Sequence, residues 1–524
     1  MTRFARLCAG CFRPQTLLLL LANLVTGGLV PLSLAPFDYW PAGLLGVALF
    51  NTLLTLQTRG HFWSALAFGC GLFGVGASWV YVSIHGFGMA STALALLLTS
   101  LFVGGLALVF ALPYCFWQRF RSTNLTVTLT VVAPLFWLFG EWLRGWLLTG
   151  FPWLYLGYGH LHTPLAGLAP VGGVLLVGWA VAVTGSGLVA LGRLALARRW
   201  PAALGLLTAL MALWLSALGM VQVEWTKPAG NSKTVALVQP NIPQELKWAP
   251  AERLPTLRLL QSLSDPLWPE VDWIVWPEAA LPMLYENAVP FLNDISQRAA
   301  ANNAALITGV LYRAPDTGEI HNSIIARGIG QGLYSKSRLV PFGEYVPLGH
   351  WLRGLLDFFN MPTSIIAPSH GAQPNLLLGD TLLSADICYE VAYPALIARH
   401  AQGANVLLTI SNDAWFGDSI GPLQHMQMAQ MRALETGRDL IRATNNGISA
   451  LVDHQGDIRT RLPQFERRVL IGEVVPRAGI TPYMLWRNNP LIGAMALAFL
   501  ALAWRARTRN RDLHADKKSL AKPT

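Results

Sequence analysis

Apolar stretches long enough to cross a lipid bilayer recur along the first 222 residues and return once near the C-terminus. The hydrocarbon core of a bilayer takes roughly 20 helical residues to cross. The predicted spans cover residues 15–34, 40–57, 62–84, 91–117, 125–148, 171–192, 202–222 and 490–504. Hydrophobic residues make up 53% of the chain and charged residues only 13%, which favours a membrane protein over an ordinary soluble enzyme. We therefore predict a multi-pass α-helical membrane domain with eight spans.

The segment between the seventh and eighth spans has a different pattern. Short β-type runs alternate there with polar helical stretches, and this order predicts a layered α/β sandwich. The strand-like runs cover 234–243, 272–282, 304–312, 322–328, 381–390, 404–416 and 448–458, and helical patterns cover 288–302 and 422–438. The predicted domains are thus a membrane domain (1–223), an inserted α/β domain (224–485), and a last span with a basic tail (486–524).

The Lys and Arg residues in the short loops predict the orientation of the chain. Basic residues precede the first span, follow the second, fourth, sixth and eighth spans, and are absent from intervening loops such as "APFDYW" and "HGFGM". Basic loops stay in the cytoplasm. Both termini are therefore predicted to be cytoplasmic, and the inserted domain to lie on the opposite side of the membrane.

The net charge of +10 also comes from the basic residues beside the predicted spans. Residues 224–480 contain 20 basic and 24 acidic side chains, whereas the rest of the chain contains 18 basic and 4 acidic ones. The excess of positive charge lies beside the predicted spans, so we predict no nucleic-acid partner.

Two features near the N-terminus have alternative interpretations. The first span has the basic start of a signal peptide, but its apolar run is long and "LVPLSLAP" is a poor cleavage site, so we favour a retained span. Cys8 and Cys11 form a CxxC pair, but no second pair or βαβ context accompanies them to indicate a metal or redox site.

Three reactive side chains lie at or just beyond predicted strand ends in the inserted domain. They are Glu278 in "VWPEAALP", Lys336 in "YSKSRLVPFGEYVP" and Cys388 in "ADICYE". A thiol becomes a useful nucleophile when a neighbouring base takes its proton, and a lysine can stabilise the oxyanion that forms on an acyl carbonyl. Cys388 is also the only cysteine of a domain predicted to be exported, where an idle thiol is a liability.

The order Glu, Lys, Cys in these surroundings resembles the nitrilase superfamily, whose αββα sandwich brings the three residues together as a catalytic triad. The flanking spans, "TGFPWLYLGY" at 149–158, "QPNIPQELKW", "LVPFGEYVPLG" and "ISNDAWFGDSIGPLQHMQMAQMRALETGR" closely resemble the bacterial apolipoprotein N-acyltransferase family. The resemblance covers nearly the whole chain. It implies an enzyme of the bacterial inner membrane, with the catalytic domain on the periplasmic side and no cofactor.

The resemblance also implies the reaction and the supporting residues. A phospholipid would acylate Cys388, and the thioester would then acylate the α-amino group of the N-terminal S-diacylglyceryl cysteine of an apolipoprotein. Glu344 would orient Lys336, and Tyr389 and Glu390 would shape the pocket of the nucleophile. Trp248 and Trp415 would gate a lipid-sized cleft, although packing or anchoring at the membrane surface explains each tryptophan equally well.

Other functions and sites remain as alternatives. A membrane-tethered amidase or nitrilase-type hydrolase would use the same triad with water as acceptor, and a transporter or receptor would use the domain only to bind ligand. Glu141 and Arg144 in "GEWLRGW" are charges near the end of the fifth span, and we expect them to pair with each other. His425 lacks the accompanying ligands of a metal site, so we predict no metal.

The predicted topology has a direct test. A reporter that is active only outside the cytoplasm should be active when fused near Gly88 or Gly230. It should be inactive when fused near Arg121 or Lys518, because these sites follow basic loops or segments. The opposite pattern of activities would contradict the orientation.

Overall fold

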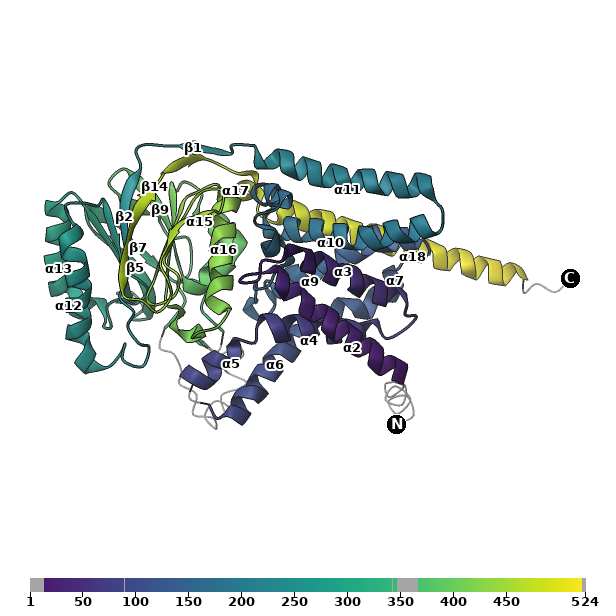
Figure 1. The fold of residues 1–524 in the computed structure, drawn as a ribbon, viewed down its shortest axis with the longest axis horizontal. Coiled ribbons are helices and arrows are strands. Elements are labelled where there is room, and N and C mark those ends of the chain that lie inside the picture. Colours follow the sequence, from purple (N-terminus) through teal and green to yellow (C-terminus); the bar gives the residue numbers. More distant parts are fainter. Residues whose placement is uncertain (1–13, 89, 342, 346–365, 521–524) are drawn as a thin grey trace.

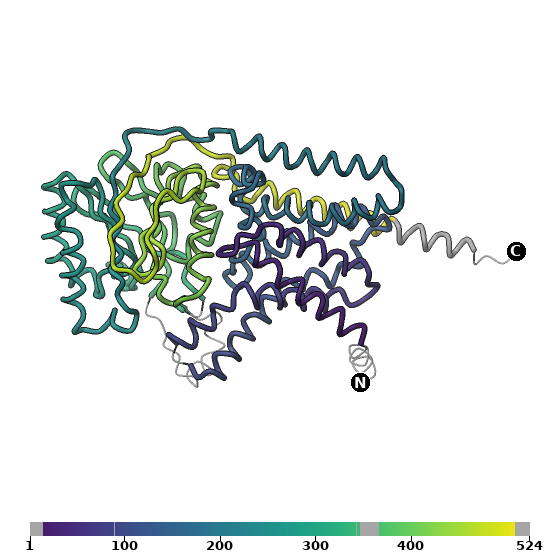
Figure 2. Tube along the Cα trace, in the orientation of Figure 1, coloured from purple at the N-terminus to yellow at the C-terminus, as the bar shows by residue number. Residues whose placement is uncertain are grey.

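The computed structural model describes residues 14–88, 90–341, 343–345 and 366–520, with side chains up to residue 508. The chain forms a helical part and an α/β part that lie end to end (Figure 1). The start of α2 and the end of α18 both lie at the end of the helical part that is remote from the α/β part (Figures 1 and 2). Cys8 and Cys11 lie outside the described residues.

The helical part is built from the described residues up to 221 and from those between 482 and 520. Its helices are α2 (Pro14–Leu29), α3 (Trp40–Thr55), α4 (His61–Gly76), α5 (Val80–Val82), α6 (Thr92–Ala111), α7 (Trp117–Phe120), α8 (Leu125–Val127), α9 (Ala133–Arg144), α10 (Ala169–Leu196), α11 (Trp200–Val221), α17 (Pro482–Trp486) and α18 (Asn489–Leu520). In the described part of the chain, six helical segments are long and apolar enough to cross a membrane. The chain is therefore a membrane protein, and the number of eight spans stays a prediction.

The two other predicted spans differ from single straight helices. Helix α3 is an apolar helix of only 16 residues. The predicted span 62–84 is broken after Gly76, where α4 meets the segment Val80–Phe87 at an angle of 61°. The side chain of Gln424 donates a hydrogen bond to the carbonyl oxygen of Gly76 (3.1 Å), so the α/β part satisfies an acceptor at the break.

The α/β part is a four-layer αββα sandwich. Within the described residues one sheet has seven strands in the order β13-β12-β11-β10-β9-β8-β6, and the other has six in the order β14-β2-β3-β4-β5-β7. The strands are β1 (Thr226–Pro228), β2 (Lys233–Gln239), β3 (Trp273–Val275), β4 (Ala305–Arg313), β5 (Ile320–Gly328), β6 (Gly330–Gln331), β7 (Leu333–Ser335), β8 (Leu376–Leu378), β9 (Thr381–Ile387), β10 (Val406–Ser411), β11 (Leu440–Thr444), β12 (Ala450–Val452), β13 (Ile458–Arg461), β14 (Arg468–Val474) and β15 (Arg477–Gly479).

Three apolar cores hold these layers together. The core between the sheets contains alternate residues of the central strands, such as Val235, Ile307 and Leu408. Helices α12 (Arg253–Ser264) and α13 (Tyr285–Ala301) cover the outer face of the six-stranded sheet. Helices α15 (Pro394–His400) and α16 (Gly421–Thr436) cover the outer face of the seven-stranded sheet. The central strands are buried on both faces and therefore read as continuous apolar runs.

The two ends of the α/β part lie side by side. Strand β1 pairs antiparallel with β15, with Thr226 opposite Gly479. Strand β1 follows α11, and β15 precedes α17 and α18. This pairing explains how a complete domain is inserted between two membrane helices.

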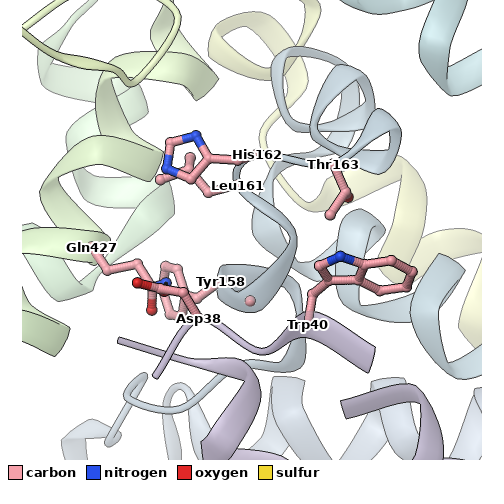
Figure 3. Close-up of a pocket in the computed structure, with 8 residues that line it drawn as sticks. Asp38, Trp40, Tyr158, Leu161, His162, Thr163 and Gln427 are labelled. Atoms are coloured by element: carbon pink, nitrogen blue, oxygen red, sulfur yellow. Dashed lines mark hydrogen bonds between the residues drawn. The ribbon is translucent and has the colours of Figure 1, made fainter. Parts of the chain in front are cut away.

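Helix α16 forms the boundary with the helical part (Figure 1). Its Gln427 accepts a hydrogen bond from the backbone N–H of Ala35 (3.1 Å) and donates one to Asp38 (3.0 Å). Gln427 and Asp38 border a small cavity of about 50 Å³ that Trp40 and Tyr158 also line (Figure 3). Further along α16, Glu435 accepts a hydrogen bond from the N–H of Val174 (2.7 Å). These polar contacts connect α16 with the helical part.

Candidate active site

The three predicted reactive residues follow strands of the two facing sheets. Glu278 follows β3, Lys336 follows β7 and Cys388 follows β9. The Nζ atom of Lys336 lies 3.5 Å from Oε1 of Glu278. Lys336 is fully buried, and Glu278 and Cys388 are 7% and 9% exposed. The structure therefore encloses a carboxylate, an ammonium group and a thiol in one region.

The charges of Glu278 and Lys336 both act on the thiol of Cys388. Burial raises the pKa of Cys388 above its usual value; the charge of Glu278 raises it further, and that of Lys336 lowers it. Burial also disfavours the charge on Lys336, but Glu344 and Glu278 outweigh this, so the pKa of Lys336 lies above its usual value. The resting site at neutral pH consequently holds a thiol beside a lysine cation.

Hydrogen bonds fix the carboxylate of Glu278. Its Oε1 accepts from the side-chain amide of Asn322 (2.7 Å), and its Oε2 accepts from the backbone N–H of Asn412 (2.8 Å). The next residue, Ala279, has a positive φ of 44°, and Gly309 packs directly behind this turn. A strained backbone of this kind persists where its surroundings determine it, and it is common in active sites.

The backbone of Cys388 is held in a similar way. Its φ is 54°, and its carbonyl oxygen accepts a hydrogen bond from Nε2 of His425 (3.0 Å). Burial, followed by the nearby Arg442 charge, lowers the pKa of His425, and its Nδ1 lies 2.9 Å from the guanidinium group of Arg442 and 3.0 Å from Oδ1 of Asp413. Arg442 also forms an ion pair with Asp413 (2.9 Å). His425 therefore positions the backbone of Cys388; the described residues contain no His, Cys, Asp and Glu group suited to a metal.

Two further carboxylates hold the segment that contains Lys336. Glu344 binds Nζ of Lys336 (2.8 Å) and the backbone N–H of Val340 (2.8 Å). Glu390 is fully buried and accepts from the N–H groups of Ile387 (2.9 Å) and Ser337 (2.8 Å). Glu390 thus joins the strand before the nucleophile to the loop after Lys336, while Glu344 contacts the lysine itself.

Tyr389 connects the nucleophile to the membrane part. Its hydroxyl donates to the carbonyl oxygen of Gly150 (3.2 Å) in the loop 149–158. Arg144 donates to the carbonyl oxygens of Phe151 (3.0 Å) and Trp153 in the same loop. Arg144, at the end of the apolar segment Leu125–Arg144, therefore holds the loop that contacts Tyr389.

The expected pairing of Glu141 with Arg144 is wrong. No ion pair joins them among the described side chains; instead Glu141 accepts a hydrogen bond from the backbone N–H of Leu156 (2.7 Å). The loop 149–158 offers backbone donors and acceptors that need buried partners. These local groups compete successfully with the opposite charge one helical turn away.

The two predicted gate residues lie at the surface. Trp248 is 43% exposed in the loop after β2, and Trp415 is 46% exposed after β10. The backbone carbonyl of Trp415 accepts a hydrogen bond from Ser83 (2.7 Å), and its ring meets that of Phe87 edge-on at 5.8 Å. Trp415 is therefore placed against the segment that follows the break in α4.

The sequence patterns did not single out several residues of the site. Asn322, Asn412, Asp413 and Arg442 act through hydrogen bonds that only the fold creates, and His425 was considered only as a metal ligand. Lys247 was also missed, although it directly precedes Trp248 in the quoted run "QPNIPQELKW". Its ammonium group donates to the carbonyl oxygen of Glu278 (2.9 Å).

Comparisons with known proteins agree with this arrangement. Residues 26–188 match the model of the apolipoprotein N-acyltransferase N-terminal domain, and residues 234–483 match that of carbon-nitrogen hydrolases. The chain is 48% identical to the apolipoprotein N-acyltransferase of Azotobacter vinelandii over 92% of this chain and 94% of that one. The chain belongs to the apolipoprotein N-acyltransferase family. It is also 47% identical to the Pseudomonas aeruginosa member, over 92% and 94% of the two chains, and 40% identical to that of Vibrio vulnificus, over 94% and 97%.

The chain is also similar, over about half of its length, to two proteins of known structure. An amidase from Nesterenkonia sp. matches with 20% identity and a TM-score of 0.37, over 51% of this chain and 98% of that one. A carbon-nitrogen hydrolase from Helicobacter pylori matches with 16% identity and a TM-score of 0.35, over 47% and 89%. Family membership makes the protein an acyltransferase that acts in lipoprotein N-acylation.

The close packing of Gly309 predicts a sensitive position. A Cβ atom there would lie 2.5 Å from the backbone nitrogen of Ala279 and 2.7 Å from the carbonyl oxygen of Pro277. Gly309→Ala should therefore displace Glu278 and slow N-acylation of a diacylated lipopeptide by about 10²-fold, measured from product mass. Gly205→Ala is the control, because that Cβ meets no atom within 4 Å. Equal rates for both variants would contradict the role of this turn.

Proposed function

We propose that this protein transfers a fatty acyl chain from a phospholipid, through a thioester on Cys388, to the α-amino group of an N-terminal S-diacylglyceryl cysteine of an apolipoprotein. The observation that carries the proposal is the buried Lys336, which contacts Glu278 and Glu344 beside the thiol of Cys388. Family membership supports the acceptor class. The hydrogen bond from Tyr389 to the loop 149–158 of the helical part supports a lipid donor.

The first half of the reaction acylates the enzyme. Because the pKa of Cys388 is raised, the proton must leave during the attack, and Glu278 is the proposed base. The sulfur attacks the ester carbonyl, and Lys336 stabilises the negative oxygen that forms. The C–O bond then breaks, the proton passes from Glu278 to the leaving glycerol oxygen, and a lysophospholipid departs.

The second half transfers the acyl chain. An α-amino group has a pKa near 8, so an appreciable fraction is neutral and nucleophilic at physiological pH. Its nitrogen attacks the thioester carbonyl, Glu278 accepts a proton from the amine, and the C–S bond breaks. The proton returns to the sulfur, which regenerates the thiol of Cys388. This sequence needs no cofactor or metal, and ping-pong kinetics should follow.

The pocket and gate residues have proposed roles in binding the two lipids. Trp415 contacts the segment Val80–Phe87, and Trp248 lies exposed in the loop that contains Lys247. Both rings suit the boundary between water and lipid. We propose that they admit the acyl chains, while Tyr389 and Glu390 keep the segment around the thiol in place.

The proposed location is the bacterial inner membrane, with both termini in the cytoplasm and the catalytic domain in the periplasm. The loop charges of the sequence support this orientation. In the structure, the start of α2 and the end of α18 lie at the same end of the helical part, away from the α/β part (Figure 1). The proposed partners are therefore the bilayer, its phospholipids and exported diacylglyceryl apolipoproteins.

The acceptor distinguishes this function from its alternatives. Purified protein incubated with phospholipid and a diacylated lipopeptide should yield triacylated lipopeptide, detected by mass. Cys388→Ser should yield none, because a hydroxyl is much harder to deprotonate than a thiol. Glu278→Gln should lose the base, and Lys336→Ala should lower the rate by about 10²–10³-fold through loss of the oxyanion partner.

Two outcomes would contradict the proposal. Release of free fatty acid with no acylated peptide would favour the membrane-tethered hydrolase. Full activity of Cys388→Ser would exclude the thiol as nucleophile and leave a binding role for the domain. The surface variant Lys233→Gln, in which a partly exposed ion pair with Asp380 is lost, serves as the matched control.

A further inference from the structure

Lys247 is a buried cation that the triad mechanism does not use. It lies in the loop 240–250 between β2 and α12, is 4% exposed, and donates from Nζ to the carbonyl oxygen of Glu278 (2.9 Å). Among the described residues, this oxygen is its one hydrogen-bond acceptor. A lysine is seldom buried unless its charge is compensated.

The loop holds Lys247 in place independently of that contact. The backbone N–H of Asn241 donates to the carbonyl oxygen of Asn445 (2.9 Å), and the side chain of Asn412 donates to Gln244 (2.7 Å). The next residue, Trp248, is largely exposed. The loop therefore presents the lysine to the interior and the tryptophan to the outside.

The negative charges around the thiol of Cys388 require a second cation besides Lys336. Lys336 is shared by two carboxylates, Glu278 and Glu344, so these three groups alone leave one negative charge uncompensated. Ionisation of Cys388 would add a second. Asp413, which also faces the thiol, is already compensated by Arg442. Lys247 interacts with the charges of Glu278 and Cys388, and its ammonium group restores neutrality in the resting site.

We propose that Lys247 is a second cation of the active site, which positions the turn at Glu278 and favours the thiolate of Cys388 during acylation. This role deepens the proposed function and rests on the nucleophilic role of Cys388. It differs from the role of Lys336, because the hydrogen bond of Lys247 goes to the backbone of the catalytic carboxylate and not to its side chain.

The ionisation of Lys247 makes the proposal testable. Burial lowers the pKa of Lys247 to about 8, against the opposing charges of Glu278 and Cys388. The lysine is thus charged below pH 8 and becomes neutral as the pH rises through that value. Its effect on the thiol should be present at low pH and fade above pH 8.

The test measures the rate at which iodoacetamide alkylates Cys388 between pH 6.5 and 9.5, in the full-length protein without lipid or acceptor. Peptide mass spectrometry separates this cysteine from the others. Lys247→Gln, which keeps a donor but no charge, should react about tenfold more slowly below pH 8, equivalent to a rise of one pKa unit in the thiol. The rates of this variant and the wild type should converge above pH 8.

Lys247→Arg provides the complementary variant, because arginine stays charged throughout this range. Its rate should keep rising tenfold per pH unit above pH 8, where the wild-type rise becomes shallower. Lys233→Gln, on the same domain, should match the wild type. The proposal is overturned if Lys247→Gln reacts at the wild-type rate below pH 8, or if its deficit is the same at every pH. A Lys247→Arg profile as shallow as that of the wild type would also overturn it.

Failure of this proposal is distinguishable from failure of the acyltransferase function. Alkylation reports only the thiol in its resting surroundings and needs neither phospholipid nor lipopeptide. A wild-type alkylation profile for Lys247→Gln would leave acyl transfer through Cys388 unaffected. Conversely, absence of acyl transfer would leave the effect of Lys247 on the thiol measurable.

Discussion

The buried ammonium group of Lys336 is the interaction on which the rest of the site depends. A lysine without solvent would lose its proton unless carboxylates compensated its charge. Glu344 and Glu278 lie 2.8 and 3.5 Å from its Nζ, and they come from different segments of the domain. The requirement for charge compensation therefore brings together the ends of β3 and β7 and the loop that contains Glu344. The ammonium group whose charge acts on the thiol of Cys388 is thereby held in a fixed position by two carboxylates.

Residues of the helical part, as well as residues of the sandwich, position the segment around Cys388. Arg144 and Glu141 bind opposite ends of the segment 151–156, whose neighbour Gly150 accepts the hydroxyl of Tyr389. From helix α16, His425 donates a hydrogen bond to the carbonyl oxygen of Cys388, and Gln424 donates one to the carbonyl oxygen of Gly76 at the end of α4. Cys388 and its neighbour Tyr389 are thus held by contacts from both parts of the chain. These intramembrane charges serve backbone groups, which explains why they do not pair with each other.

The sequence predicts the apolar helices and the layered α/β part, because long apolar runs and buried strands have strong local patterns. The strand predicted at 272–282 ends early in the structure, at Val275, because the turn around Pro277 and Ala279 leaves the regular sheet. Strand β11 was not predicted; its centre is Arg442, a charge that is buried only because Asp413 lies opposite it. Lys247 was missed for the same reason. Compensation of buried charge is a property of the fold, and a local pattern of residues does not reveal it.

The most direct test of this account is the intact mass of the protein after incubation with phospholipid in the absence of any acceptor. The account predicts an added mass equal to one fatty acyl chain, located on the peptide that contains Cys388 and absent from Cys388→Ala. A wild-type protein that stays unmodified while still acylating an added lipopeptide would contradict the thioester. An acyl increment that persists in Cys388→Ala would equally contradict the thiol of Cys388 as the nucleophile.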